Sequence, residues 1–320
     1  EKKAKLFVNS PNAIDGNEIS RCDTSSAAFQ SEEAGIVDVV AGEADILAQI
    51  RELVSMLPAN NEDNMSFTEC ADDLNRVCEG LENCAGDTSI ALSQLSDNGI
   101  FFETKRNYAK DMVTGFIKLN GATVGAVANR SEVYGEEGKV TEKFDMVLSA
   151  RGCEKAADFI AFCDAFDIPV LSLTNVKGFA SSKCSEKKMA KAVARLTYAF
   201  ANATVPKVNV ITQKAYGSAY VAMNSKAIGA DITMAWPDAE IGTMDAKLAA
   251  KIICDGQGSD AIDACAKEYA LLQTSAKSAA RRGYVDQIVA PEDTRKYVIG
   301  AFEMLYTKHE DRPAKKHGTV

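Results

Sequence analysis

The chain has 320 residues, of which 46% are hydrophobic and 25% charged, as is normal for a globular protein of one or two domains. Its formal net charge of −9 disfavours nucleic acid as a partner, because phosphate binding needs a basic patch and none stands out. No apolar run approaches the roughly 18 residues that a membrane-spanning helix requires.

Nine cysteines and two histidines restrict the chemistry that the chain can offer. No CxxC pair is present and the first residues do not resemble a signal peptide, so we expect a cytoplasmic protein with reduced thiols and no bound metal. Both histidines, His309 and His317, lie near the C-terminus. A catalytic His base would have to come from this tail, which disfavours a Ser-His-Asp triad.

The N-terminal part of the sequence predicts few regular elements. The chain begins without Met, and residues 5–10 (KLFVNS) already have the pattern of a strand, so we expect the chain to begin within a fold. A second strand is predicted at 36–40 (IVDVV), and apolar residues at helical spacing over 43–57 predict a helix that ends before Pro58. Residues 59–99 are polar and predict a connecting segment with short helices.

From residue 101 the pattern changes to strands that alternate with helices. Two apolar strands joined at Asn120-Gly121 predict a β-hairpin, because this dipeptide is the commonest two-residue hairpin turn. The later elements are predicted as helix 154–166, strand 169–174, helix 186–202, strand 207–212, a short helix from 218, strand 232–236, helices 245–253 and 259–282, strand 285–289 and helix 291–308. This alternation predicts an α/β fold with parallel strands and helices packed outside them.

One internal similarity suggests that a unit occurs twice. The segment that begins at Gly35 (GIVDVVAGEADILAQIRELVSML) aligns without gaps to the segment that begins at Gly283 (GYVDQIVAPEDTRKYVIGAFEML). Strand-then-helix units share apolar spacing by chance, but burial does not explain a shared glycine and shared aspartates. We therefore expect two copies of one fold, with the first copy incomplete.

The stretch ITQKAYGSAYVAM, residues 211–223, places the small residues Gly217, Ser218 and Ala219 where a predicted strand meets a predicted helix. Small residues let the backbone approach a bound atom, and the first N–H groups of a helix have no intrahelical partner. Two such groups can form an oxyanion hole, and one donor can be worth roughly 3 kcal/mol in a transition state. Close packing of a helix on a sheet would require the same small residues, so the motif alone leaves both interpretations open.

Two other catalytic interpretations of this turn fit less well. A nucleophilic Ser218 would need the pattern G-x-S-x-G, but Tyr216 and Tyr220 occupy the glycine positions. A phosphate loop would need G-x-x-x-x-G-K-[ST], which is absent from the sequence.

A series of segments in order resembles the biotin-dependent acyl-CoA carboxyltransferases, the family of propionyl-CoA carboxylase and methylmalonyl-CoA decarboxylase carboxyltransferase subunits. The segments that carry the resemblance are FFETKRNYAKDMVTGFIKLNGATVGAVANR, FIAFCDAFDIPVLSLTNVKGF, LTYAFANATVPKVNVITQKAYGSAYVAM, ITMAWPDAEIGTM and RRGYVDQIVAPEDTRKYVIGAFEMLYTKHEDRPAKKHG.

This resemblance implies a crotonase-type ββα superhelix, present as one complete C-terminal copy and the tail of an N-terminal copy. Residues 1–60 are expected to be the remnant of the N-terminal domain, 61–99 a connection and 100–320 the C-terminal domain. The resemblance also implies acyl-CoA as substrate, biotin on a carrier protein as the second reactant, and a homo- or hetero-oligomer. A membrane decarboxylase subunit is a further partner that it allows.

The same resemblance assigns roles to individual residues. Ser218 and Ala219 match the positions whose N–H groups form the C-terminal oxyanion hole, after Gly217. Tyr216 and Tyr220 flank them, and Val221 falls where acyl-chain preference is partly set. Gly178 and Phe179 match a substrate-binding loop and Met244 matches a turn nearby, although core packing would explain Phe179 and Met244 equally well.

Five positions depart from the family pattern, and one of them is Ser218, which replaces the second glycine of Gly-Gly-Ala. Asn175 and Lys177 replace Asp and Pro, whereas Asp245 and Leu248 replace glycines. Asp245 would repel a carboxylate substrate unless it points away or pairs with a cation such as Lys177 or Lys247.

The sequence therefore supports two functional hypotheses. The first is a carboxyltransferase-type subunit that moves a carboxyl group between an acyl-CoA and carrier-bound biotin and needs an N-terminal segment or a companion polypeptide. The second is a catalytically impaired structural subunit of such a complex, with a cavity closed by the substituted residues. Another crotonase-type reaction, such as thioester hydrolysis, would need an acid or base that the sequence does not identify.

Overall fold

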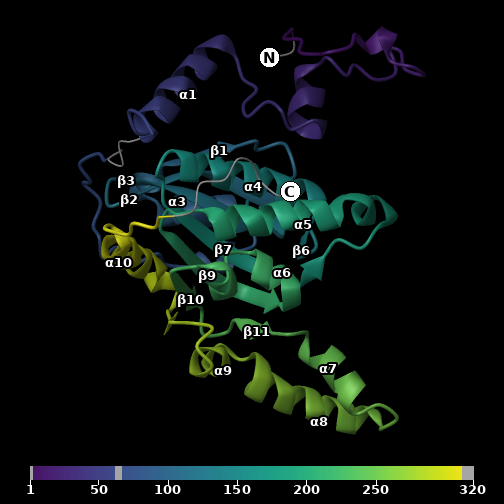
Figure 1. Ribbon diagram of the computed structural model, residues 1–320, viewed down its shortest axis with the longest axis vertical. Helices are drawn as coiled ribbons and strands as arrows, with labels where there is room; N and C mark the ends of the chain where they lie inside the picture. Colours follow the sequence, from purple (N-terminus) through teal and green to yellow (C-terminus); the bar gives the residue numbers. More distant parts are fainter. Residues whose placement is uncertain (1–2, 62–66, 312–320) are drawn as a thin grey trace.

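The computed structural model describes residues 3–61 and 67–311 and is organised around one mixed β-sheet (Figure 1). The order of its strands is β1-β2-β3-β7-β9-β10-β12, and β11 pairs with β9. These strands are β1 (Phe101–Thr104), β2 (Met112–Leu119), β3 (Ala122–Asn129), β7 (Val170–Val176), β9 (Lys207–Tyr216), β10 (Ile232–Ala235), β11 (Glu240–Gly242) and β12 (Gln287–Ile288). Two small sheets pair β4 (Glu132–Tyr134) with β5 (Val140–Lys143) and β6 (Val147–Leu148) with β8 (Gly178–Phe179).

The predicted hairpin is confirmed, and its turn shows why the sequence is Asn-Gly. Strands β2 and β3 are antiparallel, and the turn residues Asn120 and Gly121 have φ values of 50° and 79°. Asn and Gly tolerate this left-handed conformation better than other residues. The carboxylate of Asp97 accepts the amide N–H groups of both turn residues, at 3.2 and 2.7 Å. The turn is therefore held by the segment that precedes the sheet.

Helices cover both faces of the sheet, as the alternating pattern predicted. The α-helices are α1 (Glu43–Met56), α2 (Leu81–Cys84), α3 (Thr88–Leu95), α4 (Ala150–Ala165), α5 (Lys183–Asn202), α6 (Gly217–Ala222), α7 (Ala246–Ile253), α8 (Ser259–Tyr269), α9 (Ala276–Arg281) and α10 (Thr294–Leu305). Along β7, Val170 belongs to the hydrophobic cluster with α4 and α5, whereas Leu171 and Leu173 belong to the cluster with α3 and α10. Successive strand residues point to opposite faces, so the apolar run is buried on both sides.

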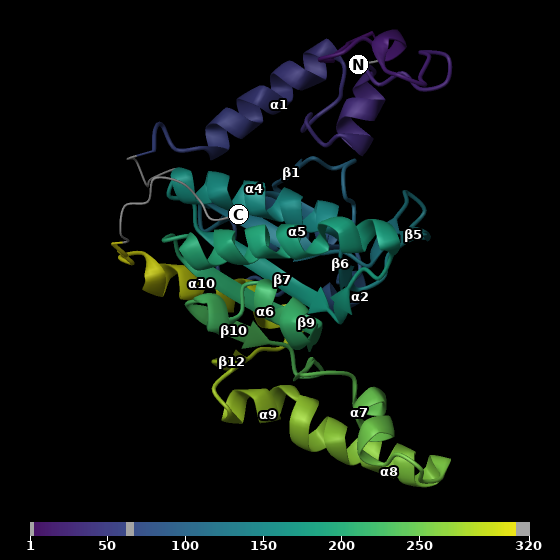
Figure 2. The same cartoon turned by 45° about the vertical axis from the view of Figure 1, so that its right-hand side comes forward.

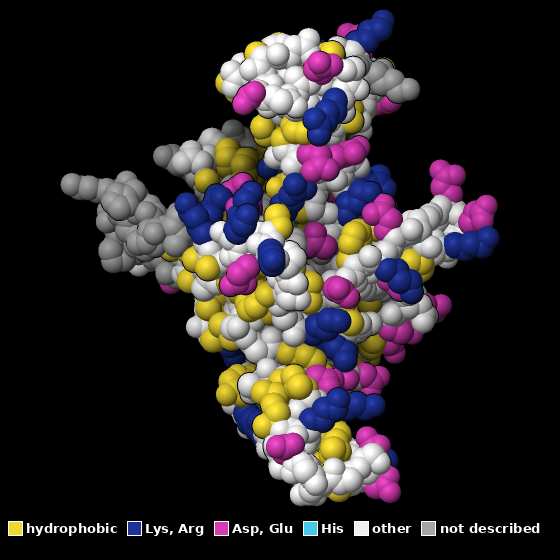
Figure 3. All heavy atoms as spheres, turned by 90° about the vertical axis from the view of Figure 1, so that its right-hand side faces the viewer, with side chains coloured by type: hydrophobic (Ala, Val, Ile, Leu, Met, Phe, Trp, Pro, Cys, Tyr) yellow, Lys and Arg dark blue, Asp and Glu magenta, His cyan; other side chains and the backbone are white. Residues whose placement is uncertain are grey.

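Two parts of the chain extend from opposite ends of this body (Figures 1 and 2). At one end lies the N-terminal segment with α1, and at the other lie α7, α8 and α9. The space-filling view shows hydrophobic side chains at the surface of the α7–α9 projection (Figure 3). The exposed hydrophobic residues of α7, α8 and the turn that follows include Leu248, Ile252, Ile253, Leu271 and Leu272.

The strands predicted at 5–10 and 36–40 are wrong. In the first segment only Lys5 forms a bridge, with Ser26, and residues 36–40 form no strand. Among the described residues neither segment lies beside a partner strand long enough to complete a ladder, and strand formation requires one. The helix predicted after them is confirmed as α1.

The single long helix predicted at 259–282 is also wrong. The chain forms α8, then a π-helical turn over Ala270–Thr274, and then α9. Ser275 has an extended ψ of 145°, and its hydroxyl accepts the Ser278 amide N–H at 3.2 Å. This is an N-cap, so a new helix begins where the apolar spacing alone suggested continuity. The strand predicted at 285–289 is confirmed but shorter, as β12.

The two similar segments share a backbone feature. Gly35 and Gly283 have φ values of 65° and 79°, a conformation that glycine adopts without strain. Each is followed by a helix, α1 and α10. The domain boundaries at residues 60 and 99 stay a prediction. In the described part of the chain, no helix combines the length and the apolar character that crossing a membrane requires.

Candidate active site

The turn between β9 and α6 borders a cavity of about 450 Å³. The cavity brings together all of the predicted site residues except Tyr220 and Val221. Its lining consists of Met146, Lys177, Gly178, Phe179, Lys214, Tyr216, Gly217, Ser218, Ala219, Thr243, Met244, Asp245 and Leu248. Four separate segments of the sequence, at 146, 177–179, 214–219 and 243–248, thus meet where β9 ends.

Gly217 is required by the geometry of this turn. Its φ of +58° lies in the left-handed region, and a Cβ atom there would lie 3.1 Å from the Thr243 carbonyl oxygen. A side chain would therefore be strained by its own backbone and crowded by the neighbouring segment. The glycine lets β9 pass directly into α6.

The amides of Ser218 and Ala219 lie in the first turn of α6. Among the described residues, neither N–H group donates to a side chain or to a carbonyl outside that helix, and the first turn of a helix supplies no internal acceptor. The Ser218 residue is exposed, whereas the Ala219 side chain is buried in the core. Both residues thus border the cavity, and their amides have no acceptor outside α6 among the described residues.

A second wall comes from the loop that follows β7. Gly178 and Phe179 form β8, in which Phe179 pairs with Leu148 of β6. The Lys177 N–H donates to the Met146 carbonyl at 2.8 Å, which fixes the start of this loop. A Cβ atom at Gly178 would meet nothing within 4 Å, so this glycine borders open space.

Charged groups surround the mouth of the cavity. The Tyr216 hydroxyl donates to the Glu240 carboxylate, and the Lys214 ammonium lies 3.9 Å from the same carboxylate. Burial, followed by the Glu240 hydrogen bond, raises the pKa of Tyr216, so this phenol stays protonated. The Lys177 ammonium lies 3.9 Å from the Asp145 carboxylate and is half-exposed.

Asp245 is occupied by a structural role. Its Oδ1 atom accepts the backbone N–H groups of Lys247 and Leu248, at 3.0 and 3.2 Å. It is therefore the N-cap of α7, and the structure pairs it with neither the Lys177 nor the Lys247 ammonium. The departure from glycine is thus explained by the helix that begins here.

Tyr220 and Val221 lie apart from the cavity. Tyr220 belongs to the core, and burial raises the pKa of its phenol to about 12. The Val221 side chain is 36% exposed. Their binding roles stay predictions.

Of the two histidines, the structure describes only His309, which lies away from this cavity. The His309 side chain is exposed, and its Nε2 atom lies 3.1 Å from the Asp311 carboxylate, away from the cavity lining. His317 lies outside the described residues.

Sequence reasoning missed Met146, Lys214 and Thr243 as lining residues. Lys214 carried a usable signal, because it lies on the strand that leads directly into the Gly217 turn. Met146 and Thr243 carried none, since their positions depend on contacts between distant segments.

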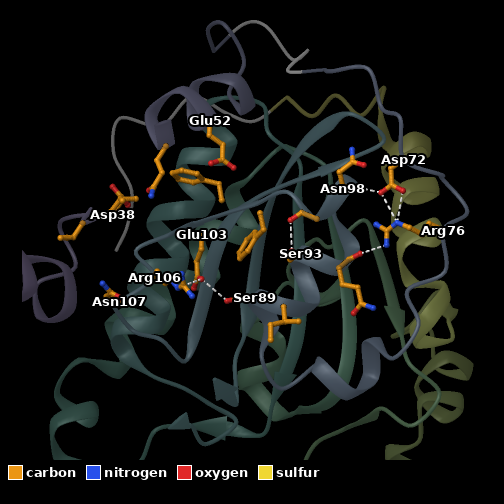
Figure 4. Close-up of a pocket in the computed structure, with 18 residues that line it drawn as sticks. Asp38, Glu52, Asp72, Arg76, Ser89, Ser93, Asn98, Glu103, Arg106 and Asn107 are labelled. Carbon is orange, nitrogen blue, oxygen red and sulfur yellow. Dashed lines mark hydrogen bonds and ion pairs between the residues drawn. The ribbon is translucent and has the colours of Figure 1, made fainter. Parts of the chain in front are cut away.

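A larger cavity of about 940 Å³ lies elsewhere, between the N-terminal segment and the body (Figure 4). Asp38 and Glu52 come from the N-terminal side, whereas Asp72, Glu103 and Arg106 come from the body. Figure 4 shows that its polar groups are largely paired with one another, as Arg76 is with Asp72 at 3.0 Å. This cavity therefore marks the boundary between two parts of the chain rather than the predicted site.

Comparison with known proteins identifies the class. The model of the carboxyl transferase domain family matches residues 1–320, so the chain belongs to that family. It is 34% identical to the methylmalonyl-CoA decarboxylase subunit alpha of Propionigenium modestum, over 100% of this chain and 63% of that protein. It is 36% identical to the propionyl-CoA carboxylase beta chain of Roseobacter denitrificans, over 98% of this chain and 62% of that protein.

The solved structures agree with the sequence comparison. The transcarboxylase 12S structure, a hexamer with hydrolysed methylmalonyl-coenzyme A bound, has a TM-score of 0.90 and 33% identity, and the match covers 99% of this chain and 63% of that one. The predicted crotonase-type fold is thereby confirmed. The chain spans less than two thirds of the length of these relatives.

Proposed function

We propose that this chain is a carboxyltransferase-type subunit that moves a carboxyl group between an acyl-CoA and biotin on a carrier protein. The observation that carries the proposal is the pair of Ser218 and Ala219 amides, which border a cavity in a chain of the carboxyl transferase domain family. Relatives named for methylmalonyl-CoA and propionyl-CoA make a short acyl-CoA the first substrate class to test.

The chemistry needs a place for negative charge. Removing or adding a carboxyl group beside a thioester, or at a ureido nitrogen, leaves charge on a carbonyl oxygen. Two N–H donors fixed in a turn stabilise such an oxygen without having to reorganise during the reaction. Biotin supplies the nitrogen that carries the carboxyl group. This chemistry needs no histidine base.

The proposed partners follow from the same family. A biotin carrier protein would deliver the carboxyl group, and a membrane decarboxylase subunit is a further partner in a decarboxylase complex. An oligomer built on the C-terminal half is expected. The counterpart of this turn in the first copy would come from an N-terminal segment or a companion polypeptide.

The test removes one amide while keeping the helix. Ser218→Pro deletes a single N–H in the first turn of α6, where proline is tolerated. In the complex isolated from native cells, carboxyl transfer from methylmalonyl-CoA to the biotin carrier should fall about 100-fold or more. Ser218→Ala keeps the amide and should lose far less. Equal activity of Ser218→Pro and wild type would refute the role of the amide.

A structural subunit is the second candidate, favoured by the residues that line the cavity in place of Pro and Gly. Lys177 and Leu248 both narrow it. If this candidate is right, the complex that contains Ser218→Pro transfers carboxyl groups at the wild-type rate. The remaining subunits of the complex dissociate from one another when this chain is absent.

A further inference from the structure

Helix α6 is too short to position itself. It has six residues, so it makes few internal hydrogen bonds, and isolated helices of this length are not stable in water. The placement of the Ser218 and Ala219 amides therefore depends on what holds the other end of the helix. That end is formed by Val221, Ala222 and the C-cap residue Met223.

A fully buried polar cluster holds this end. Its centre is Asn209 on β9, whose Nδ2 donates to the Met223 carbonyl at 3.3 Å. The Asn209 Oδ1 accepts the hydroxyl of Thr174 at 2.8 Å and that of Ser172 at 3.0 Å. All three side chains have 0% exposure. They lie between the sheet and α6, in a region that apolar residues would otherwise fill.

The turn after α6 closes the cluster. Asn224 has a left-handed φ of 52°, and its Nδ2 donates to the Ser172 hydroxyl at 2.9 Å. The Ser225 hydroxyl donates to the Val221 carbonyl at 2.9 Å. The last carbonyls of a helix lack internal partners, so these bonds satisfy the end of α6 and fix it to β7 and β9.

We propose that Asn209 is a positioning residue, which holds α6 through the Met223 carbonyl and thereby sets the Ser218 and Ala219 amides at the cavity. Asn209 contacts no part of the cavity lining that a substrate would touch. Burying polar groups is unfavourable unless they are hydrogen-bonded, and purely apolar packing would hold the sheet as well. The cluster instead gives one defined placement of the helix.

The chain offers a matched set of variants. Thr174→Val keeps the shape and removes a hydroxyl that donates to the Asn209 Oδ1 at 2.8 Å and also lies 3.3 Å from the Met223 carbonyl, whereas Thr174→Ser keeps the hydroxyl. Thr233 on β10 pairs with Asn209 in register, is equally buried, and has a hydroxyl with no hydrogen-bond partner among the described residues. Thr233→Val is therefore a control for deleting a buried hydroxyl beside the same residue.

Hydrogen exchange of the amides in 220–223, measured by mass spectrometry, tests the positioning without relying on activity. Asn209→Leu and Thr174→Val should speed this exchange at least 10-fold, while exchange in α4 stays unchanged. Thr174→Ser and Thr233→Val should match wild type. If Asn209→Leu does not fold, Thr174→Val alone decides. Wild-type exchange in Thr174→Val would overturn the proposal.

A kinetic readout follows and rests on the proposed function. Thr174→Val should lower kcat for carboxyl transfer about 10-fold with KM for acyl-CoA unchanged, and Thr174→Ser should restore it. A loss confined to KM, or an equal loss in Thr233→Val, would contradict positioning. If wild type shows no transfer, the proposed function fails, whereas the exchange result still decides whether Asn209 holds α6.

Discussion

Helices α1 and α10 have the same spacing of apolar residues in two similar segments, yet they lie in different surroundings (Figures 1 and 2). In α10, Arg295 and Val298 pack against the sheet with exposures of 0% and 1%. Their counterparts in α1, Leu47 and Ile50, are 57% and 50% exposed. An amphipathic pattern thus predicts a helix and its apolar face, but not whether a surface is present to cover that face.

Unlike Leu47, Ile50 lies on the face of α1 that is directed at the body, where Ile50 and Leu53 line a cavity with Phe116. Met56 is buried in the main core, and its carbonyl accepts the Thr123 hydroxyl at 2.6 Å. Apolar residues on two faces are typical of a helix that lies between two layers.

The largest expected difference in the free energy of unfolding is that between a variant at Arg295 and a variant at Leu47. The Arg295 guanidinium is fully buried, pairs with Asp97, lies 3.4 Å from Asp72 and donates to the Asp73 carbonyl at 2.6 Å. Arg295→Ala leaves the buried Asp97 carboxylate without its cation and should lower the free energy of unfolding by about 3–5 kcal/mol. Leu47→Ala should change it by less than about 0.5 kcal/mol. Urea denaturation of both variants measures the contrast, and similar losses would contradict it.

For the aligned glycines Gly35 and Gly283, we expect the larger loss of stability in the N-terminal segment, at Gly35. At Gly35 a Cβ atom would lie 2.6 Å from the Tyr108 ring, whereas at Gly283 it would meet nothing within 4 Å. Gly283→Ala should cost roughly 1–2 kcal/mol, the strain of a left-handed residue. Gly35→Ala adds a steric clash and should cost roughly 2–4 kcal/mol. Thermal unfolding compares them, and a larger loss at Gly283 would show that the Tyr108 contact is unimportant.

The stability of the region around Tyr108 should also depend on pH, because the buried Lys155 ammonium donates to the Tyr108 carbonyl. The Lys155 ammonium is buried and donates to the carbonyls of Lys105, Tyr108 and Met112, and burial lowers its pKa to about 7. Between about pH 7 and pH 10.5 the unfolded chain binds more protons than the folded chain, so the free energy of unfolding rises with pH. Relative to Lys155→Met, wild type should gain roughly 2 kcal/mol between pH 7 and pH 9.

Equilibrium unfolding in urea at both pH values measures this gain. A constant difference between the two proteins would mean that Lys155 does not titrate in this range. Lys110→Met serves as the control for removing a lysine, because the Lys110 ammonium is only partly buried and pairs with Glu142.

The smallest contrast is that between Val298 and Ile50. Val298→Ala leaves a gap in the core of α10 and should cost roughly 1–2 kcal/mol. Ile50→Ala removes a half-exposed side chain and should cost less than about 0.5 kcal/mol. Urea denaturation of both variants measures the contrast, and an equal loss for Ile50→Ala would show that Ile50 packs against the body across the cavity that it lines.

Most of the sheet could be predicted from the sequence because its signals are local. The Asn120-Gly121 turn and the alternating apolar runs determine the hairpin and the βα order without reference to distant residues. The strands predicted at 5–10 and 36–40 failed because a ladder needs a partner, which local pattern does not report. The break before Ser275 was missed because its capping role competes with helical spacing.

The candidate site likewise contains some residues that the sequence indicated and others that it did not. Gly217, Ser218 and Ala219 were identified because the small residues at a strand-to-helix junction indicate backbone exposure. Thr243 and Met146 were missed because they reach the cavity from separate segments. Asp245 was expected to act through its charge, and it caps α7 instead, a role that required knowing where that helix begins.

The root of the α7–α9 projection is also a wall of the cavity, since Asp245 and Leu248 belong to both. A protein that binds the exposed side chains of the projection would therefore contact the same helix that forms this wall. Binding of that protein and access of a substrate to the cavity would then be coupled.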